Sequence, residues 1–156
     1  MPRKKMDKKW IEVDSSRVML LHEASEDLKF EKAAARAYAV MLNTLDPLVF
    51  VPLLAETVRY SSQKVLENLD GKKRVTKYFV DKMSAIEKGF PDLKVFAEMG
   101  EWQGRPCVVV AQGEKEPPVA VVIFGVKDKT VLTVDLCTEI PNPDMATRSG
   151  LYPETV

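Results

Sequence analysis

The chain has 156 residues, and its 23 lysines and arginines are balanced by 23 aspartates and glutamates. A chain of this length can bury enough surface to fold as one domain without disulfides or metals. Its zero net charge disfavours a nucleic-acid binder or a protein that adheres to anionic membranes.

The two cysteines, Cys107 and Cys137, lack the Cys and His spacing that metal sites and redox motifs require. No apolar run reaches the roughly 20 residues needed to cross a bilayer, and the N-terminus lacks the apolar core of a secretory signal. We therefore expect a cytoplasmic protein that uses no metal or cofactor and binds neither nucleic acid nor a membrane.

Residues 1–23 are expected to form an N-terminal tail and lead-in. The first nine are mostly basic, and the isolated Trp10 beside them does not make the basic and aromatic patch of a nucleic-acid-binding arm. A solvated tail is the simpler interpretation. The apolar run 18–21 is consistent with a strand or with the start of a helix.

A helix is predicted over 25–45, where apolar residues recur every three or four positions and Ser25 is a suitable N-cap. Tyr38, on its apolar stripe, is expected to belong to the core. Asp46-Pro47 should end this helix and begin another, because proline disfavours helical geometry before it but fits the first turn of a helix. The nearly all-apolar segment 48–54 is predicted to be a short, buried helix.

A strand is predicted over 58–66, followed by a turn at 68–71 and a second amphipathic helix that ends at Gly89. Tyr78 lies on the core stripe of this helix. Beyond it, four β-rich runs are separated by short turns, which predicts an antiparallel meander; the runs are 94–101, 106–113, 118–126 and 130–139. Residues 141–156 have no periodicity and are expected to form an extended C-terminal tail.

This order of elements predicts an α+β domain with helices on one face of a curved antiparallel sheet. The runs 108–111 and 119–124 are apolar at alternate positions on both faces, so the second face also needs a cover. A second copy of the sheet is the simplest cover, which predicts a homodimer that associates through the sheet.

Local runs in the predicted elements, taken in this order, resemble the nuclear transport factor 2-like superfamily, also called SnoaL-like or cystatin-like. The runs are Leu42-Asn43, Asp46-Pro47, 54–60, 69–72 and 133–136. The resemblance covers roughly residues 25–140 and implies a domain at 24–140. It also implies that the helices pack on the concave face of the sheet, as a cone with an internal apolar pocket. Relatives use that pocket for catalysis, as in ketosteroid isomerase, scytalone dehydratase and limonene epoxide hydrolase, or for binding or protein association.

The resemblance implies that a catalytic member would have a carboxylate in a dry pocket, and Asp135 in the last strand is the candidate. Asp135 shares its side of the strand with Thr133 and Cys137. If that side lines the pocket, burial would raise the pKa of Asp135 and suit it to proton transfer. The alternative is a carboxylate that is solvated or hydrogen-bonded at a sheet edge or dimer rim. The only histidine, His22, lies outside the resemblance, so no His-based dyad or triad is expected.

Other polar residues are candidates for ligand binding. Tyr60 and Ser62 share one strand face and could orient a carbonyl or hydroxyl group, whereas Gln63 points to the other face unless a bulge intervenes. Packing of their side chains alone would account equally well for Tyr60 and Ser62. Glu98 is a second carboxylate candidate, and Trp102 either caps the sheet or stacks on a ligand.

The favoured hypothesis is that the apolar pocket binds a small hydrophobic or amphipathic molecule. The first alternative is a lyase, isomerase or hydrolase in which Asp135 is the base and Tyr60 orients the substrate. That enzyme would require Asp135 to lie beside Tyr60 around an open cavity. The second alternative is an association module whose pocket is filled by its own side chains.

Overall fold

The computed structural model describes residues 24–89 and 94–156, so the predictions for residues 1–23, including His22, lie outside the described residues. The N-terminal helix covers residues 24–44. The elements that follow are η1 (Pro47–Val49), η2 (Val51–Leu53), β1 (Leu54–Ser62), β2 (Val65–Asp70), α2 (Lys72–Gly89), β3 (Phe96–Trp102), β4 (Arg105–Ala111), β5 (Pro118–Lys127), β6 (Thr130–Cys137), η3 (Pro143–Met145) and β7 (Thr147–Arg148).

The N-terminal helix confirms the helical pattern predicted over 25–45, and its apolar stripe, with Tyr38 fully buried, packs into the core. The helix ends at Leu45, whose φ of 58° is in the left-handed region. The Asp46 side chain then accepts a hydrogen bond from the Leu48 N–H at 3.0 Å and caps η1. The predicted helix at 48–54 is instead two short 3-10 turns, and Leu48 is 70% exposed while Phe50 is buried.

The strand predicted over 58–66 was wrong in its extent, because the segment is a hairpin of β1 and β2. Ser62 pairs with Val65, and the Ser62 Oγ accepts a hydrogen bond from the Lys64 N–H at 3.3 Å. A serine side chain of this kind can close a turn that contains no glycine or proline. Gly71, with a φ of 96°, then leads from β2 into α2, which ends at Gly89 as predicted.

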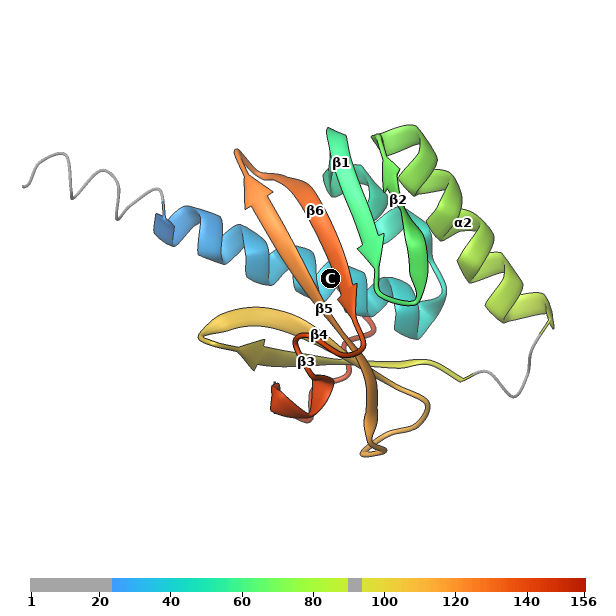
Figure 1. Ribbon diagram of the computed structural model, residues 1–156, viewed down its shortest axis with the longest axis vertical. Helices are drawn as coiled ribbons and strands as arrows, with labels where there is room; N and C mark the ends of the chain where they lie inside the picture. Colours follow the sequence, from blue (N-terminus) through green and yellow to red (C-terminus); the bar gives the residue numbers. More distant parts are fainter. Residues whose placement is uncertain (1–23, 90–93) are drawn as a thin grey trace, which may run out of the picture.

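The seven strands form one sheet in the order β2-β1-β6-β5-β4-β3-β7. The predicted meander is confirmed, because β3, β4, β5 and β6 pair antiparallel in sequence. The sheet as a whole is mixed, since β1 runs parallel to β6. Figure 1 shows the N-terminal helix passing behind the strands and α2 lying beside β1 and β2. The architecture is the predicted α+β arrangement of helices on one face of a curved sheet.

The main core lies between the helices and the inner face of the sheet. Its largest fully buried side chains include Tyr38, Phe50, Phe79 and Phe124. A second cluster lies on the outer face and contains Cys107, Val109, Val121 and Cys137. The two clusters explain why the middle strands are apolar at alternate positions on both faces.

The cover of the outer cluster is the chain's own C-terminal segment, residues 143–152. Ala146 packs against the cluster, η3 contacts β5, and β7 adds to the free edge of β3. Gly100 permits this close approach, because a Cβ at that position would lie 2.8 Å from the Thr147 carbonyl oxygen and 2.9 Å from the Val109 side chain. At these positions the apolar pattern does not require a second copy of the chain, and the homodimer stays a prediction.

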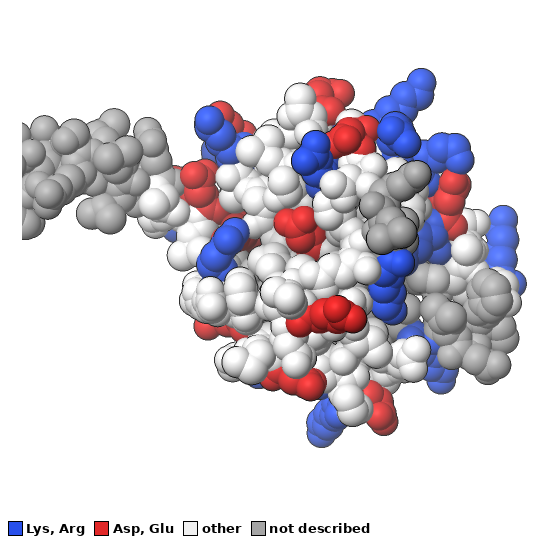
Figure 2. All heavy atoms as spheres, in the orientation of Figure 1, with Lys and Arg blue, Asp and Glu red and all other residues white. Residues whose placement is uncertain are grey.

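The surface is mixed in charge, with basic and acidic side chains interspersed over the face seen in Figure 2. None of the helices in the described ranges is long and apolar enough to cross a membrane. Within those same ranges, no group of three or more His, Cys, Asp or Glu side chains is arranged to hold a metal ion.

Candidate functional site

A pocket of about 400 Å³ lies between the N-terminal helix, α2 and the inner face of the sheet. Its wall includes Tyr38 from the N-terminal helix, Tyr60 and Ser62 from β1, and Tyr78 from α2. The apolar part of the wall comes from Leu42, Ala85, Ile86, Val95, Val110, Ala111, Val119, Ala120 and Leu136. The pocket has the volume and the mainly apolar lining that are typical of small-molecule sites.

An aromatic cluster fills the core next to this pocket. The rings of Tyr38 and Phe50 are 5.2 Å apart, and those of Tyr38 and Phe124 are 5.5 Å apart, both edge to face. Phe79 packs against both Tyr38 and Tyr60 in the same way, at 5.9 and 5.3 Å. Edge-to-face packing holds these rings in fixed orientations, so the wall that they present to the pocket is rigid.

Three tyrosines belong to the pocket wall, and their hydroxyl groups differ in environment. The hydroxyl oxygens of Tyr60 and Tyr78 are 3.4 Å apart. The Tyr38 hydroxyl is buried and has no hydrogen-bond partner among the described residues. Burial raises the pKa of both Tyr38 and Tyr60, because a phenolate would lose its solvation there. Both side chains are therefore neutral phenols that can donate a hydrogen bond.

The charged residues of the pocket wall are all lysines. They are Lys64 after β1, Lys82 on α2 and Lys94 before β3, and we call them the lysine rim. The described residues that line the pocket include no aspartate, glutamate, histidine or cysteine. The wall therefore offers hydrogen-bond donors and positive charge, but no carboxylate that could act as a base.

Asp135 lies on the other face of the sheet. In the parallel pairing of β1 with β6, Tyr60 is opposite Val134 and Ser61 is opposite Asp135, so Tyr60 and Asp135 point to opposite faces. Asp135 lines a separate hollow of about 500 Å³ with Ser61 and other outer-face residues. Partial burial raises the pKa of Asp135, and a hydrogen bond with Ser61 opposes this rise. The structure thus does not bring Asp135 and Tyr60 together around one cavity.

Gln63 is engaged with the backbone after β6. Its Oε1 accepts hydrogen bonds from the N–H groups of Thr138 and Glu139, both at 2.7 Å, and from that of Ile140 at 3.3 Å. Its Nε2 donates to the Ile140 carbonyl. Gln63 therefore fixes the course of the chain beyond β6 and lines the outer hollow, away from the inner pocket.

Glu98 and Trp102 are also on the outer face. Glu98, 3% exposed, lies under the C-terminal segment and accepts hydrogen bonds from Arg148, Gly150 and Tyr152. Trp102 packs against the outer cluster. Of the ligand-binding residues predicted from the sequence, the structure places Tyr60 and Ser62 on the inner pocket and the others outside it.

Sequence reasoning did not single out Tyr38, Tyr78 or the lysine rim. Both tyrosines were assigned to the core by their helical spacing, and Tyr38 is indeed fully buried there as well as on the pocket wall. The spacing of Tyr78, Lys82 and Ile86, four residues apart, places them on one face of α2. That spacing was the available signal for Lys82, whereas Lys64 and Lys94 join it only through the fold.

A third hollow, of about 670 Å³, lies between the N-terminal helix and the C-terminal segment. Its charged wall residues include Lys29 and Lys32, which are exposed, and Arg36, whose Nε donates to the Thr155 carbonyl at 3.0 Å. Arg148 also lines this hollow and has a buried Nη2 without a partner among the described residues, but its side chain is 26% exposed, whereas Tyr38 is fully buried. The inner pocket is therefore the better candidate for a ligand-binding site.

No protein-family model and no curated protein sequence matches the chain. Many solved structures match it in fold. A candidate ketosteroid isomerase from Kribbella flavida is 24% identical, with a TM-score of 0.51 over 70% of this chain and 78% of that one. A SnoaL-like protein of unknown function from Burkholderia thailandensis is 19% identical, with a TM-score of 0.53 over 70% of this chain and 94% of that one.

An epoxide hydrolase from M. tuberculosis, described as LEH-like, is 13% identical, with a TM-score of 0.50 over 76% of this chain and 87% of that one. At these identities the similarity is one of fold, and one fold supports many activities. The similarity agrees with the α+β arrangement of helices and sheet described above. The chain has the nuclear transport factor 2-like fold, as the resemblance in its sequence predicted.

Proposed function

We propose that this protein binds a small hydrophobic or amphipathic molecule in the inner pocket. The observation that carries the proposal is a mainly apolar pocket of about 400 Å³ whose lining includes Tyr38, a fully buried side chain whose hydroxyl has no hydrogen-bond partner among the described residues. A buried hydroxyl without a partner costs about 1–3 kcal/mol. A ligand oxygen that accepts a hydrogen bond from Tyr38 would recover that cost.

The two alternatives have less support. A carboxylate-dependent enzyme would need an acidic side chain in the pocket, and the described wall residues include none. Asp135, the residue proposed for that role, lines a hollow on the opposite face. An association module with a filled pocket agrees with the aromatic cluster, but not with the open volume beside Tyr60 and Tyr78.

The test uses the same chemical change at two tyrosines. In Tyr38→Phe, the unliganded protein should become more stable by about 1 kcal/mol, because an unsatisfied buried hydroxyl is removed. Tyr152→Phe is the matched control. Its hydroxyl donates to Glu98 at 3.2 Å and accepts from the Lys115 N–H at 3.1 Å, so this variant should lose stability. Urea unfolding measures whether the free energy of unfolding rises in Tyr38→Phe and falls in Tyr152→Phe.

Ligand binding is then measured by thermal unfolding with small apolar alcohols, ketones and acids. A ligand at a hundred times its dissociation constant stabilises the native state by about 2.7 kcal/mol. Tyr38→Phe should reduce this stabilisation, although the variant itself is more stable. The proposal is refuted if Tyr38→Phe destabilises the protein as Tyr152→Phe does and no compound raises the melting temperature.

A further inference from the structure

The lysine rim allows a statement about the chemical class of the ligand, which rests on the binding function proposed above. Lys64, Lys82 and Lys94 come from three separate parts of the chain, yet all three line the same pocket. The protein as a whole has equal numbers of basic and acidic residues, and its visible surface is mixed in charge (Figure 2). A wall with three positive charges and no negative one therefore departs from the rest of the molecule.

The rim lysines also differ from other lysines in their contacts. Lys29 and Lys77 form ion pairs with Glu26 and Asp81, at 3.3 and 2.7 Å. None of the three rim lysines forms an ion pair with another described residue. The Lys82 Nζ instead lies 5.6 Å from the centre of the Tyr78 ring. Their positive charge is thus not neutralised by a neighbouring carboxylate within the described chain.

The residues of the pocket wall differ in exposure. Tyr38 is fully buried, Tyr60 is 3% exposed, and Tyr78 and Lys82 are partly exposed. Lys64 and Lys94 are exposed. Tyr38 and Tyr60 therefore belong to the buried part of the wall, and Lys64 and Lys94 belong to the part that faces solvent.

We propose that the pocket binds a free amphipathic acid, with its anionic head at the lysine rim and its apolar body along the inner wall. The body would pack on the aliphatic side chains between the two ends, such as Leu42, Val110 and Leu136. Lysine acts as a flexible point charge, so the rim favours a negative charge and does not fix the geometry of the head group.

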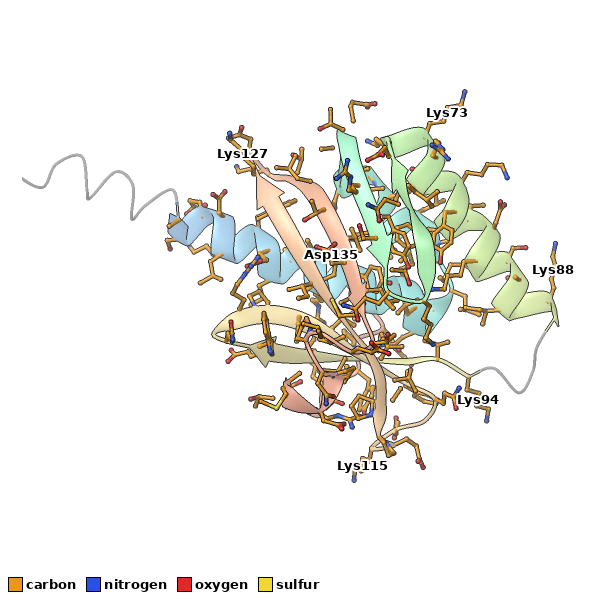
Figure 3. All side chains as sticks on the ribbon, viewed as in Figure 1. Lys73, Lys88, Lys94, Lys115, Lys127 and Asp135 are labelled. Atoms are coloured by element: carbon orange, nitrogen blue, oxygen red, sulfur yellow. The ribbon has the colours of Figure 1, made fainter. Side chains whose placement is uncertain are left out.

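The experiment compares decanoate with decanol, which have the same apolar chain and differ in the charge of the head group. Binding to the full chain is measured by titration calorimetry at low and at high salt. The first variant is Lys64→Gln/Lys82→Gln/Lys94→Gln. The matched control is Lys73→Gln/Lys115→Gln/Lys127→Gln, which removes the same charge from residues that do not line the pocket and that lie at different edges of the molecule in Figure 3.

Decanoate should bind the natural protein more tightly than decanol does. The rim variant should lose about tenfold in decanoate affinity, because each ion pair of a solvent-exposed lysine contributes little and the variant removes three of them together. Its affinity for decanol should not change, and the control variant should bind both compounds like the natural protein. Added salt should weaken decanoate binding alone, because it screens the rim.

The outcomes separate the two proposals. If decanol and decanoate bind equally, or if the rim and control variants behave alike, the acid preference is refuted and the binding function stands. If neither compound binds, the binding function fails and the acid preference fails with it. The salt dependence of the natural protein decides the question if the rim variant does not fold.

Discussion

Replacement of Glu98 by glutamine should weaken the attachment of the C-terminal segment to the sheet. The Oε1 atom of Glu98 accepts hydrogen bonds from Arg148 Nε at 2.7 Å and from the Tyr152 hydroxyl at 3.2 Å, and its Oε2 accepts from the Gly150 N–H at 2.6 Å. Every partner is a donor. Glutamine keeps the shape of the side chain, but its NH₂ group would face one of these donors in either orientation.

The size of the expected loss in stability follows from the burial of the Glu98–Arg148 ion pair. Removal of one partner of a buried ion pair costs about 3–5 kcal/mol. The Glu98 side chain is 3% exposed, whereas that of Arg148 is 26% exposed and can regain some hydration. The Arg148 Nη1 also keeps its hydrogen bond to the Glu116 carbonyl at 2.7 Å. We therefore expect Glu98→Gln to lower the free energy of unfolding by about 2–3 kcal/mol, somewhat less than that range.

Urea unfolding measures this loss, and amide hydrogen exchange locates it. The Met99 N–H donates to the Leu151 carbonyl at 2.9 Å, and the Ser149 N–H donates to the Met99 carbonyl at 3.2 Å. Both amides should exchange faster in Glu98→Gln. Glu101→Gln is the control, because Glu101 is exposed on the same strand and its replacement should change stability by no more than about 0.5 kcal/mol. A loss as small as that for Glu98→Gln, with unchanged exchange, would contradict the reasoning.

Two further predictions concern the sheet. Gly125→Ala should destabilise the protein by about 1–3 kcal/mol, because the added Cβ would overlap the Thr133 Oγ1 on the neighbouring strand. In urea unfolding, the double variant Gly125→Ala/Thr133→Ala should recover most of that loss. If the losses of the two single changes simply add, the proposed contact is refuted. Burial raises the pKa of the Cys107 and Cys137 thiols to about 12 and about 11 from an ordinary value of 9.0, so both should resist alkylation at pH 8 until the protein unfolds. Because the unfolded chain loses these protons first, the free energy of unfolding should fall as the pH rises from about 9 toward 12, and a rise over that range would contradict the assignment.

Local patterns in the sequence predicted the helices and the meander well. The N-terminal helix and α2 each have an apolar stripe with the helical period, and Gly89 ends α2 where a glycine was expected. The four runs of the meander are rich in residues that favour strands and are separated by short turns with recognisable residues. These features depend on neighbours within a few positions, which is the range that sequence patterns cover.

The missed elements depend on distant parts of the chain. The Gln63-Lys64 turn contains no glycine or proline, so the hairpin of β1 and β2 was interpreted as one strand. The strand β7 consists of only Thr147 and Arg148, and it exists because the free edge of β3 accepts it. No pattern within two residues could indicate such a strand.

For the candidate site, too, the sequence predicted what depends on neighbouring residues and missed what depends on distant strands. Period-two alternation predicted that Tyr60 and Ser62 share one face of the strand, and both line the inner pocket, but alternation could not say which face Asp135 would occupy. That choice depends on the pairing of β1 with β6, in which Ser61 and not Tyr60 is opposite Asp135. A shift by one residue would have turned Asp135 into the pocket, because successive strand residues point to opposite faces.

The class of fold, the two long helices, the meander and the apolar character of both faces of the middle strands follow from the sequence alone. Only the tertiary structure decided what covers each face: the helices on the inner face, and the chain's own C-terminal segment over the outer cluster. It also brings Tyr38 and Tyr60 into the wall of one pocket, together with Lys64, Lys82 and Lys94. The physical reason is that burial and charge at a site are properties of neighbours in space, and these neighbours are far apart in the chain.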